Sequence, residues 1–335
     1  MITSGTYEQR RPVDSSGGPD WSALLADYRR TRAEAFARGG ERVAAEQVAA
    51  LGHMVALGAP APIAAALFDP AAGPGAAAGE QDNWVGPLWE VLAVRHLWRE
   101  LAALPIAGPV RTLVAHTRVL LGEDLAGERL AAAPPVLHPW EQAGWEVGDR
   151  VTEYRAGGAA ATPHFPLPES REGLTPVALP PAVPPTVAGW PATAALGGLC
   201  EWVSARCVRG TAAEAAALFA AAESVGEPGG PPGGSVTGGY LPFAAAYPAL
   251  VRAGSGAGAY GRSGGAARGR VRVWRALAAM ADPSGECSPA EVDALVARMR
   301  CYTWCAPADE VWYLHLALED PATGLAWAVS GSDYD

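Results

Sequence analysis

The stretch VWYLHLALEDPATGLAWAV, from Val311 to Val329, carries the clearest β-strand signal in the sequence. Two apolar runs, VWYLHLAL and LAWAV, flank Glu319 to Gly324, a segment that contains proline and glycine. Such runs on either side of a glycine-containing turn are typical of a β-hairpin. We therefore predict a hairpin over these residues.

Upstream of this hairpin, helical and strand patterns alternate. Thr211 and Ser288 each stand where a side chain can cap the free N–H groups at the start of an apolar-periodic segment. We predict helices over 211–224, 266–281 and 288–298, a strand over 299–304, and either a strand or a helix end over 200–208.

The N-terminal third of the chain has only helical patterns. Asp20 can cap the first helix, and Gly39 and Gly40 end it. We predict helices over 21–38, 41–57, 62–68, 84–101 and 110–121, which together form a bundle or a short solenoid.

Proline interrupts the pattern between these two parts, because it removes a backbone donor and restricts the residue before it. Within this region, residues 152–155 can form one short strand. The predicted organisation is a disordered N-terminus (1–19), a helical part (20–130), a Pro/Trp-rich irregular connection (131–195) and an α+β part with the terminal hairpin (196–335). The fold class is α+β and rich in helix.

All 25 basic residues of the 335-residue chain are arginines. A pyridoxal-phosphate Schiff base, a P-loop and a protein kinase each require a lysine at a fixed place. The absence of lysine therefore excludes these three classes of protein.

The net charge of −10 argues against general nucleic-acid binding, which requires a positive surface. No apolar run reaches the roughly 18 residues that span a bilayer, and residues 1–20 lack the apolar core of a signal peptide. The five cysteines form no CxxC pair. We expect a cytoplasmic protein with reduced, mostly buried thiols and no membrane partner.

The segment GSGAGAYGRSGGAARG, residues 254–269, matches two glycine motifs. A dinucleotide fingerprint of the form GxGxxG needs a preceding strand and a downstream acid, and neither is well placed here. A GxSxG nucleophile elbow would make Ser263 the nucleophile, with His315 as the one downstream histidine. Chance matches are expected in a chain with 40 glycines, and a structural role for His315 stays open.

Residues 228–281 contain six arginines and no acidic residue, which predicts a local positive field in an acidic protein. These are Arg252, Arg262, Arg268, Arg270, Arg272 and Arg275.

Three of these arginines, Arg268, Arg272 and Arg275, fall on one face of the predicted helix 266–281. The glycines before that helix can present N–H groups to an anion at its N-terminus. The predicted ligand-binding set is Gly261, Arg262, Gly264, Arg268, Arg272 and Arg275. The alternative is that the arginines pair with acidic residues from elsewhere in the chain.

Metal and cofactor sites are not predicted. His96 and Glu100 share a helical face, but two ligands do not make a metal site. A Trp-rich segment carries His138, Glu141, Glu146 and Glu153, where loops often hold binding residues. Its tryptophans, Trp140 and Trp145, are expected to anchor the loop. The acidic tip Ser332 to Asp335 could bind a cation, but we expect a frayed terminus.

The segments GAYGRSGGAARGRVRVWRALAAM (258–280) and DEVWYLHLALEDPATGLAWAVSGSDYD (309–335) resemble an uncharacterised actinobacterial family, domain of unknown function 6183. HTRVLLGEDL (116–125) and residues 140–158 are similar to it less specifically. The C-terminal tail departs from the family's acidic pattern. The resemblance implies one evolutionary unit over most of the chain and implies no activity.

Two functions are expected from these patterns. The first is a non-catalytic binding or regulatory protein whose Arg/Gly-rich turn holds an acidic protein partner or a phosphorylated small molecule. The second is a cofactor-independent hydrolase or transferase of bacterial secondary metabolism, with Ser263 and His315 as weak catalytic candidates. An immunity or toxin-related role stays open.

Overall fold

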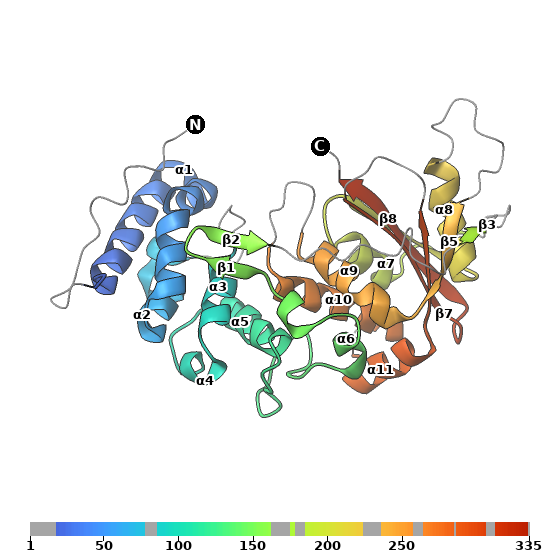
Figure 1. The fold of residues 1–335 in the computed structure, drawn as a ribbon. Helices are drawn as coiled ribbons and strands as arrows, with labels where there is room; N and C mark the ends of the chain where they lie inside the picture. The colour runs from blue at the N-terminus through green and yellow to red at the C-terminus, as the bar shows by residue number, and fades with distance from the viewer. Residues whose placement is uncertain are drawn as a thin grey trace. The chain divides into compact units, whose positions relative to one another are not determined.

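The computed structural model describes residues 18–77, 86–161, 175–177, 185–223, 236–256, 264–284, 286–305 and 312–333. Helices and an antiparallel sheet occupy different parts of the chain, so the fold is α+β, as predicted (Figure 1). The segment predicted to be disordered lies outside the described residues up to residue 17.

The chain divides into two compact units, each discontinuous in sequence. Unit 1 comprises residues 1–123 and 152–162, and unit 2 comprises residues 124–151 and 163–335. The predicted irregular connection, residues 131–195, therefore contributes to both units.

Unit 1 is mainly helical. Its α-helices are α1 (Trp21–Gly58), α2 (Ala61–Ala65), α3 (Leu88–Arg95), α4 (Trp98–Leu101) and α5 (Gly108–Leu120), and its 3-10 helices are η2 (Ala66–Phe68) and η3 (Pro70–Gly75). Asp20 caps α1 by accepting a hydrogen bond from the Ala23 N–H at 3.0 Å. The expected break occurs inside α1, where Gly40 has φ +73°.

One predicted helix is interrupted in the structure. A single helix was expected over 84–101, but His96 is extended and separates α3 from α4. The side chain of Glu123 accepts hydrogen bonds from the Trp98 N–H at 3.1 and 3.2 Å. The Glu100 side chain also accepts a hydrogen bond from the Leu97 N–H at 2.9 Å, so one local contact and one from 25 residues away stabilise the new helix start.

A small hairpin, β1 (Glu153–Arg155) and β2 (Gly158–Ala161), completes unit 1. The Tyr154 hydroxyl donates a 2.6 Å hydrogen bond to buried Glu90 on α3. His53 on α1 contacts the Arg155 carbonyl oxygen through Nε2 at 2.6 Å. The predicted short strand is thus confirmed, and it pairs within the unit that holds the N-terminal helices.

Unit 2 is built on a six-stranded antiparallel sheet in the order β3-β5-β6-β7-β8-β4. Its strands are β3 (Thr175–Val177), β4 (Val203–Arg209), β5 (Val236–Leu241), β6 (Arg300–Cys305), β7 (Trp312–Asp320) and β8 (Leu325–Asp333). The predicted hairpin is confirmed: β7 and β8 pair from Trp312↔Asp333 to Asp320↔Leu325. Gly324, with φ +65°, closes the turn.

Helices cover both faces of this sheet (Figure 1). The Ala-rich helix α8 (Ala212–Glu223) packs on the face that carries Trp304, Ala317 and Ala328. On the other face, Trp190 at the start of α7 (Pro191–Gly197) packs against Trp327. Helix α10 (Ala266–Ala281) contacts both α7 and α9 (Phe243–Gly254), which places them on one side of the sheet.

The remaining elements of unit 2 are the short helix α6 (Pro139–Gln142), the 3-10 helix η4 (Val147–Asp149) and α11 (Pro289–Arg298). The Ser288 side chain caps α11, as the sequence predicted. None of the helices within the described ranges combines the length and the apolar character required to cross a bilayer.

Candidate functional site

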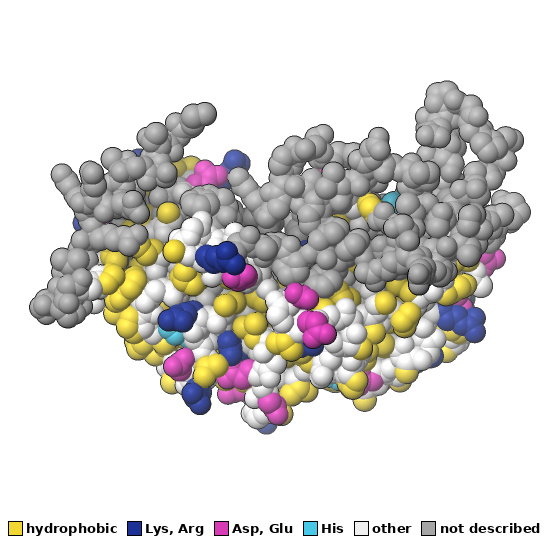
Figure 2. Space-filling model, viewed as in Figure 1, with side chains coloured by type: hydrophobic (Ala, Val, Ile, Leu, Met, Phe, Trp, Pro, Cys, Tyr) yellow, Lys and Arg dark blue, Asp and Glu magenta, His cyan; other side chains and the backbone are white. Residues whose placement is uncertain are grey.

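Charged side chains are dispersed over the face of the molecule that Figure 2 shows. Arginine side chains alternate there with Asp and Glu side chains, and the described residues of this face form no broad basic area. The described residues of this face thus offer no extended binding surface for an anion, and the candidate site is a local pocket.

Such a pocket lies in unit 2, between residues 130–135 and helices α10 and α11. Its volume of about 490 Å³ falls within the range usual for sites that bind small molecules. Three lining residues, Trp274, Arg275 and Cys287, carry polar side-chain atoms. The remaining lining is aliphatic or proline: Leu130, Ala132, Ala133, Pro134, Pro135, Ala278, Pro289 and Val292.

The wall of this pocket contains a strained residue. Ala132 has φ +73°, and it is the one non-glycine residue with positive φ in the part of the chain that the structure describes. This conformation costs an L-residue about 1–2 kcal/mol. Such strain persists only where surrounding contacts enforce it, and it gathers at binding sites.

Arg270 on α10 enforces the path of this wall. Its guanidinium donates hydrogen bonds of 3.0 Å to the carbonyl oxygens of Pro134 and Val136. The same group forms a buried ion pair with Glu141, with N–O distances of 2.8 and 3.0 Å.

Glu141 itself is completely buried and accepts two further hydrogen bonds. The Tyr247 hydroxyl donates at 2.5 Å and the Trp274 indole N–H donates at 3.0 Å. Burial alone would raise the pKa of Glu141, but the charge and hydrogen bonds of Arg270 outweigh it and lower the pKa. Burial and the Glu141 charge raise the pKa of Tyr247. Glu141 is thus held as a carboxylate.

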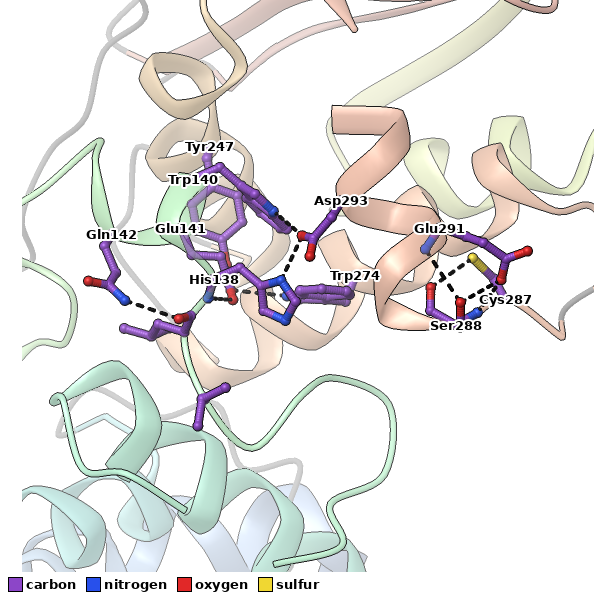
Figure 3. A network of polar contacts seen from close by, with 12 residues as sticks. His138, Trp140, Glu141, Gln142, Tyr247, Trp274, Cys287, Ser288, Glu291 and Asp293 are labelled. Carbon is purple, nitrogen blue, oxygen red and sulfur yellow. Dashed lines mark hydrogen bonds and ion pairs between the residues drawn. The ribbon is translucent and has the colours of Figure 1, made fainter. Parts of the chain in front are cut away.

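A second contact joins the same segment to α11 (Figure 3). Asp293 accepts a hydrogen bond from the Trp140 indole N–H at 2.8 Å, and its carboxylate lies 2.6 Å from His138 Nδ1. Trp140 also packs edge-on against Tyr247 and lies against Trp274, with ring centroids 5.2 Å apart in both cases. The tryptophan therefore anchors the segment, as expected.

The predicted arginines have separate roles in the structure. Arg270 is paired with Glu141, and Arg272 donates to the carbonyl oxygens of Leu199 and Gly254 at 2.8 and 3.0 Å. Arg252 is buried. Arg275 is exposed, lines the pocket, and has no hydrogen bond or ion pair with any residue that the structure describes.

The predicted glycine-rich turn is described only in part. Gly261, Arg262 and Ser263 lie outside the described residues. Gly264 donates its N–H to the Ser255 carbonyl oxygen at 2.6 Å. The guanidinium of Arg268 lies against Gly264, 2.8 Å from where a Cβ would stand, so these two predicted residues are neighbours.

His315 is buried on β7 and contacts a serine that the sequence did not single out. Its Nδ1 lies 3.0 Å from the Ser330 hydroxyl, and the two residues are directly paired across β7 and β8. A hydroxyl beside an imidazole is the first part of a nucleophile and base arrangement. Neither residue lines the pocket described above.

The other candidates have structural partners. His96 Nδ1 lies 4.0 Å from a Glu100 carboxylate oxygen, and within the described ranges no three His, Cys, Asp or Glu side chains could hold a metal ion. Glu146 precedes η4, and Glu153 forms an exposed ion pair with Arg155 at 2.9 Å. Asp333 ends β8, whereas residues 334 and 335 lie outside the described part.

Cys287 is the half-exposed thiol of the pocket. Burial, followed by the charges of Glu291 and Asp282, raises its pKa. Burial raises the pKa of Cys200 to about 12 and that of Cys207 to about 11. A raised pKa means less thiolate, which is the reactive form.

We expect iodoacetamide to alkylate Cys287 before Cys200 and Cys207 but more slowly than free cysteine at pH 8, with the rate rising as pH rises. Peptide mass spectrometry over a time course measures this, and Cys287→Ser is the control. Alkylation of native Cys287 as fast as in the urea-unfolded chain would contradict the assigned environment.

The residues that anchor the segment beside the pocket through Trp140 and Glu141 were not identified from the sequence. Asp293 drew no attention because it reads as an ordinary member of the predicted helix 288–298, and Tyr247 belongs to α9, a helix that was not predicted. The run Pro134-Pro135 was recognised only as irregular, although its fixed backbone forms part of the lining.

Comparison with models of known protein families, with curated proteins and with solved structures gives no match to this chain. The resemblance to domain of unknown function 6183 therefore stays a prediction.

Proposed function

We propose that this protein is a non-catalytic binding protein for a small anionic molecule, and that the molecule binds in the pocket beside Arg275. The observation that carries this proposal is an exposed guanidinium with no described partner at the wall of a pocket whose other lining side chains are mostly aliphatic or proline. Such pockets, with few polar groups that orient the ligand, are the usual form of small-molecule sites.

Charge complementarity supports the assignment of the ligand as an anion. A guanidinium is always ionised and presents a planar fork of N–H donors that matches carboxylate and phosphate oxygens. The pocket lining contains no acidic side chain that could neutralise it. The anion site that we propose is therefore at Arg275 on α10, and not at the glycine-rich turn that precedes this helix.

The expected location, the acidic protein partner and the enzyme alternative are also proposals. A cytoplasmic location is supported by the described cysteines, which are free thiols. An acidic protein partner would bind at the surface, where its carboxylates could pair with the exposed Arg275. The hydrolase or transferase alternative stays a prediction, because its nucleophile candidate, Ser263, lies outside the described residues.

A thermal-shift screen of the full chain against carboxylates, phosphorylated metabolites and nucleotides tests the proposal. A ligand at a hundred times its Kd adds about 2.7 kcal/mol of stability, which raises Tm by several degrees. We expect a stabilising anion whose effect is lost in Arg275→Gln, because the substitution removes the charge that holds the ligand.

The control is Arg42→Gln, which removes an exposed charge in unit 1. It should leave the shift intact. A shift that survives Arg275→Gln would contradict the assigned site, and the absence of any shift across the panel would contradict small-anion binding.

A further inference from the structure

The pocket beside Arg275 offers one unused polar side chain, and this restricts the class of ligand that it can hold. The Trp274 indole N–H is committed to Glu141 at 3.0 Å, so its ring presents only hydrocarbon to the pocket. The Cys287 thiol is directed to the Ser288 carbonyl oxygen at 3.4 Å. A ligand with several hydroxyl or amide groups would leave them without partners, at about 1–3 kcal/mol for each buried group.

The charge around the pocket restricts the ligand further. Arg275 supplies one positive charge, whereas the Glu291 carboxylate lies beside Cys287, where it accepts hydrogen bonds from the N–H and hydroxyl of Ser288 at 2.7 Å. After burial, the charges of Glu291 and Asp282 are the causes that raise the pKa of Cys287. A phosphate monoester carries a charge between −1.5 and −2 at pH 7, so part of its charge would face these carboxylates without compensation. A carboxylate carries −1 and can accept two parallel hydrogen bonds from one guanidinium.

The apolar side chains of the lining favour a ligand with a hydrocarbon part. Proline, alanine, leucine and valine side chains form the walls with Trp274, and burying each methylene group of a ligand there contributes about 0.8 kcal/mol. Two methylene groups therefore change affinity about ten-fold.

We propose that the ligand is a monocarboxylate with an apolar body, whose carboxylate binds Arg275 and whose hydrocarbon part lies over Trp274 and the proline wall. This rests on the proposed function and names its ligand class. Phosphorylated metabolites are disfavoured by their excess negative charge, sugars by their many hydroxyl groups, and neutral lipids by the lack of a charge that pairs with Arg275.

Isothermal titration calorimetry at pH 7.5 with four matched probes tests the ligand class on the full chain. The probes are octanoate, hexanoate, 1-octanol and octyl phosphate. We expect octanoate to bind about ten-fold more tightly than hexanoate, because it buries two more methylene groups. It should also bind at least ten-fold more tightly than 1-octanol and octyl phosphate, because only octanoate matches the single charge of Arg275.

Two variants locate the binding. In Arg275→Gln, octanoate should bind no more tightly than 1-octanol, because the positive charge that favours the carboxylate is gone. In Ala278→Phe, a larger side chain fills the pocket, and octanoate binding should weaken at least ten-fold while Arg275 remains. Circular dichroism confirms that both variants are folded.

The outcomes separate the ligand class from the proposed function. Tighter binding of octyl phosphate that depends on Arg275 would overturn the monocarboxylate class and leave the anion-binding function standing. Equal binding of octanoate and 1-octanol to the wild-type chain would overturn both. Octanoate binding that survives Ala278→Phe, or no octanoate binding to the wild-type chain, would overturn the assignment of a monocarboxylate to this pocket. The wider thermal-shift screen would then decide whether the protein binds another anion.

Discussion

Replacing Glu141 by alanine is expected to lower the free energy of unfolding of unit 2 by about 3–5 kcal/mol. The substitution leaves the guanidinium of Arg270 fully buried without its carboxylate, and it removes the acceptor of the Tyr247 and Trp274 hydrogen bonds. Urea denaturation of the full chain, followed by circular dichroism and tryptophan fluorescence, measures the loss.

The double variant Glu141→Leu with Arg270→Met should be more stable than Glu141→Ala, because a pair of buried charges is replaced by apolar groups of similar size. Glu153→Ala is the matched control, since it breaks an ion pair that is exposed, and it should cost less than about 1 kcal/mol. A loss below 1 kcal/mol for Glu141→Ala would show that the network does not hold residues 134–142 in place.

The same carboxylate also predicts a pH dependence. The pKa of Glu141 in the folded protein lies below its ordinary value of 4.5, so its contribution to stability is complete above that value and is lost as pH falls through the lower pKa. Unfolding free energies of the wild-type chain should therefore fall more steeply below pH 4.5 than those of Glu141→Gln. Equal slopes would contradict the lowered pKa.

Replacing Gly269 by alanine is expected to cost about 3 kcal/mol or more, at the upper end of the range for overpacked cores. A Cβ at this position of α10 would collide with the Val251 carbonyl oxygen of α9 and lie 3.0 Å from the Ser255 backbone nitrogen. Both obstacles are backbone atoms, so the helices must separate. Thermal and urea denaturation measure the effect.

Gly108→Ala is the matched control for this substitution. Gly108 is the first residue of α5, and a Cβ there would meet no atom within 4 Å. Its replacement should be neutral or stabilising by about 0.4–1 kcal/mol, because it reduces the freedom of the unfolded chain. If Gly269→Ala proved as mild as Gly108→Ala, the close approach of α9 and α10 would be refuted.

Local sequence patterns were sufficient for the elements whose ends carry local signals. The helix over 266–281 has the predicted limits, the hairpin forms around Gly324, and Ser288 caps α11. The interruption at His96 was missed because one of the two carboxylates that stabilise the new helix start, Glu123, lies 25 residues from Trp98. Caps supplied by tertiary contacts have no local signature.

The candidate site was less predictable for the same reason. Arg275 belonged to the predicted basic set, but nothing in the sequence distinguished it from Arg270, which is buried against a glutamate 129 residues away. One sequence does not reveal which acid pairs with which arginine. The pocket depends on that pairing, because Arg270 also holds the backbone of Pro134 and Val136.

The chain passes between the two units three times, and this limits how the gene can be cut. A fragment that ends at Glu123 would lack the β1–β2 hairpin, and with it the Tyr154 hydroxyl on Glu90 and the Arg155 carbonyl oxygen on His53. No single cut leaves both units with all of their segments, because a cut after residue 162 takes residues 124–151 from unit 2 and a cut after residue 123 takes residues 152–162 from unit 1. Separating the two units completely would require residues 152–162 to be joined by a linker to 1–123, and gene fission at any single junction would leave at least one unit incomplete.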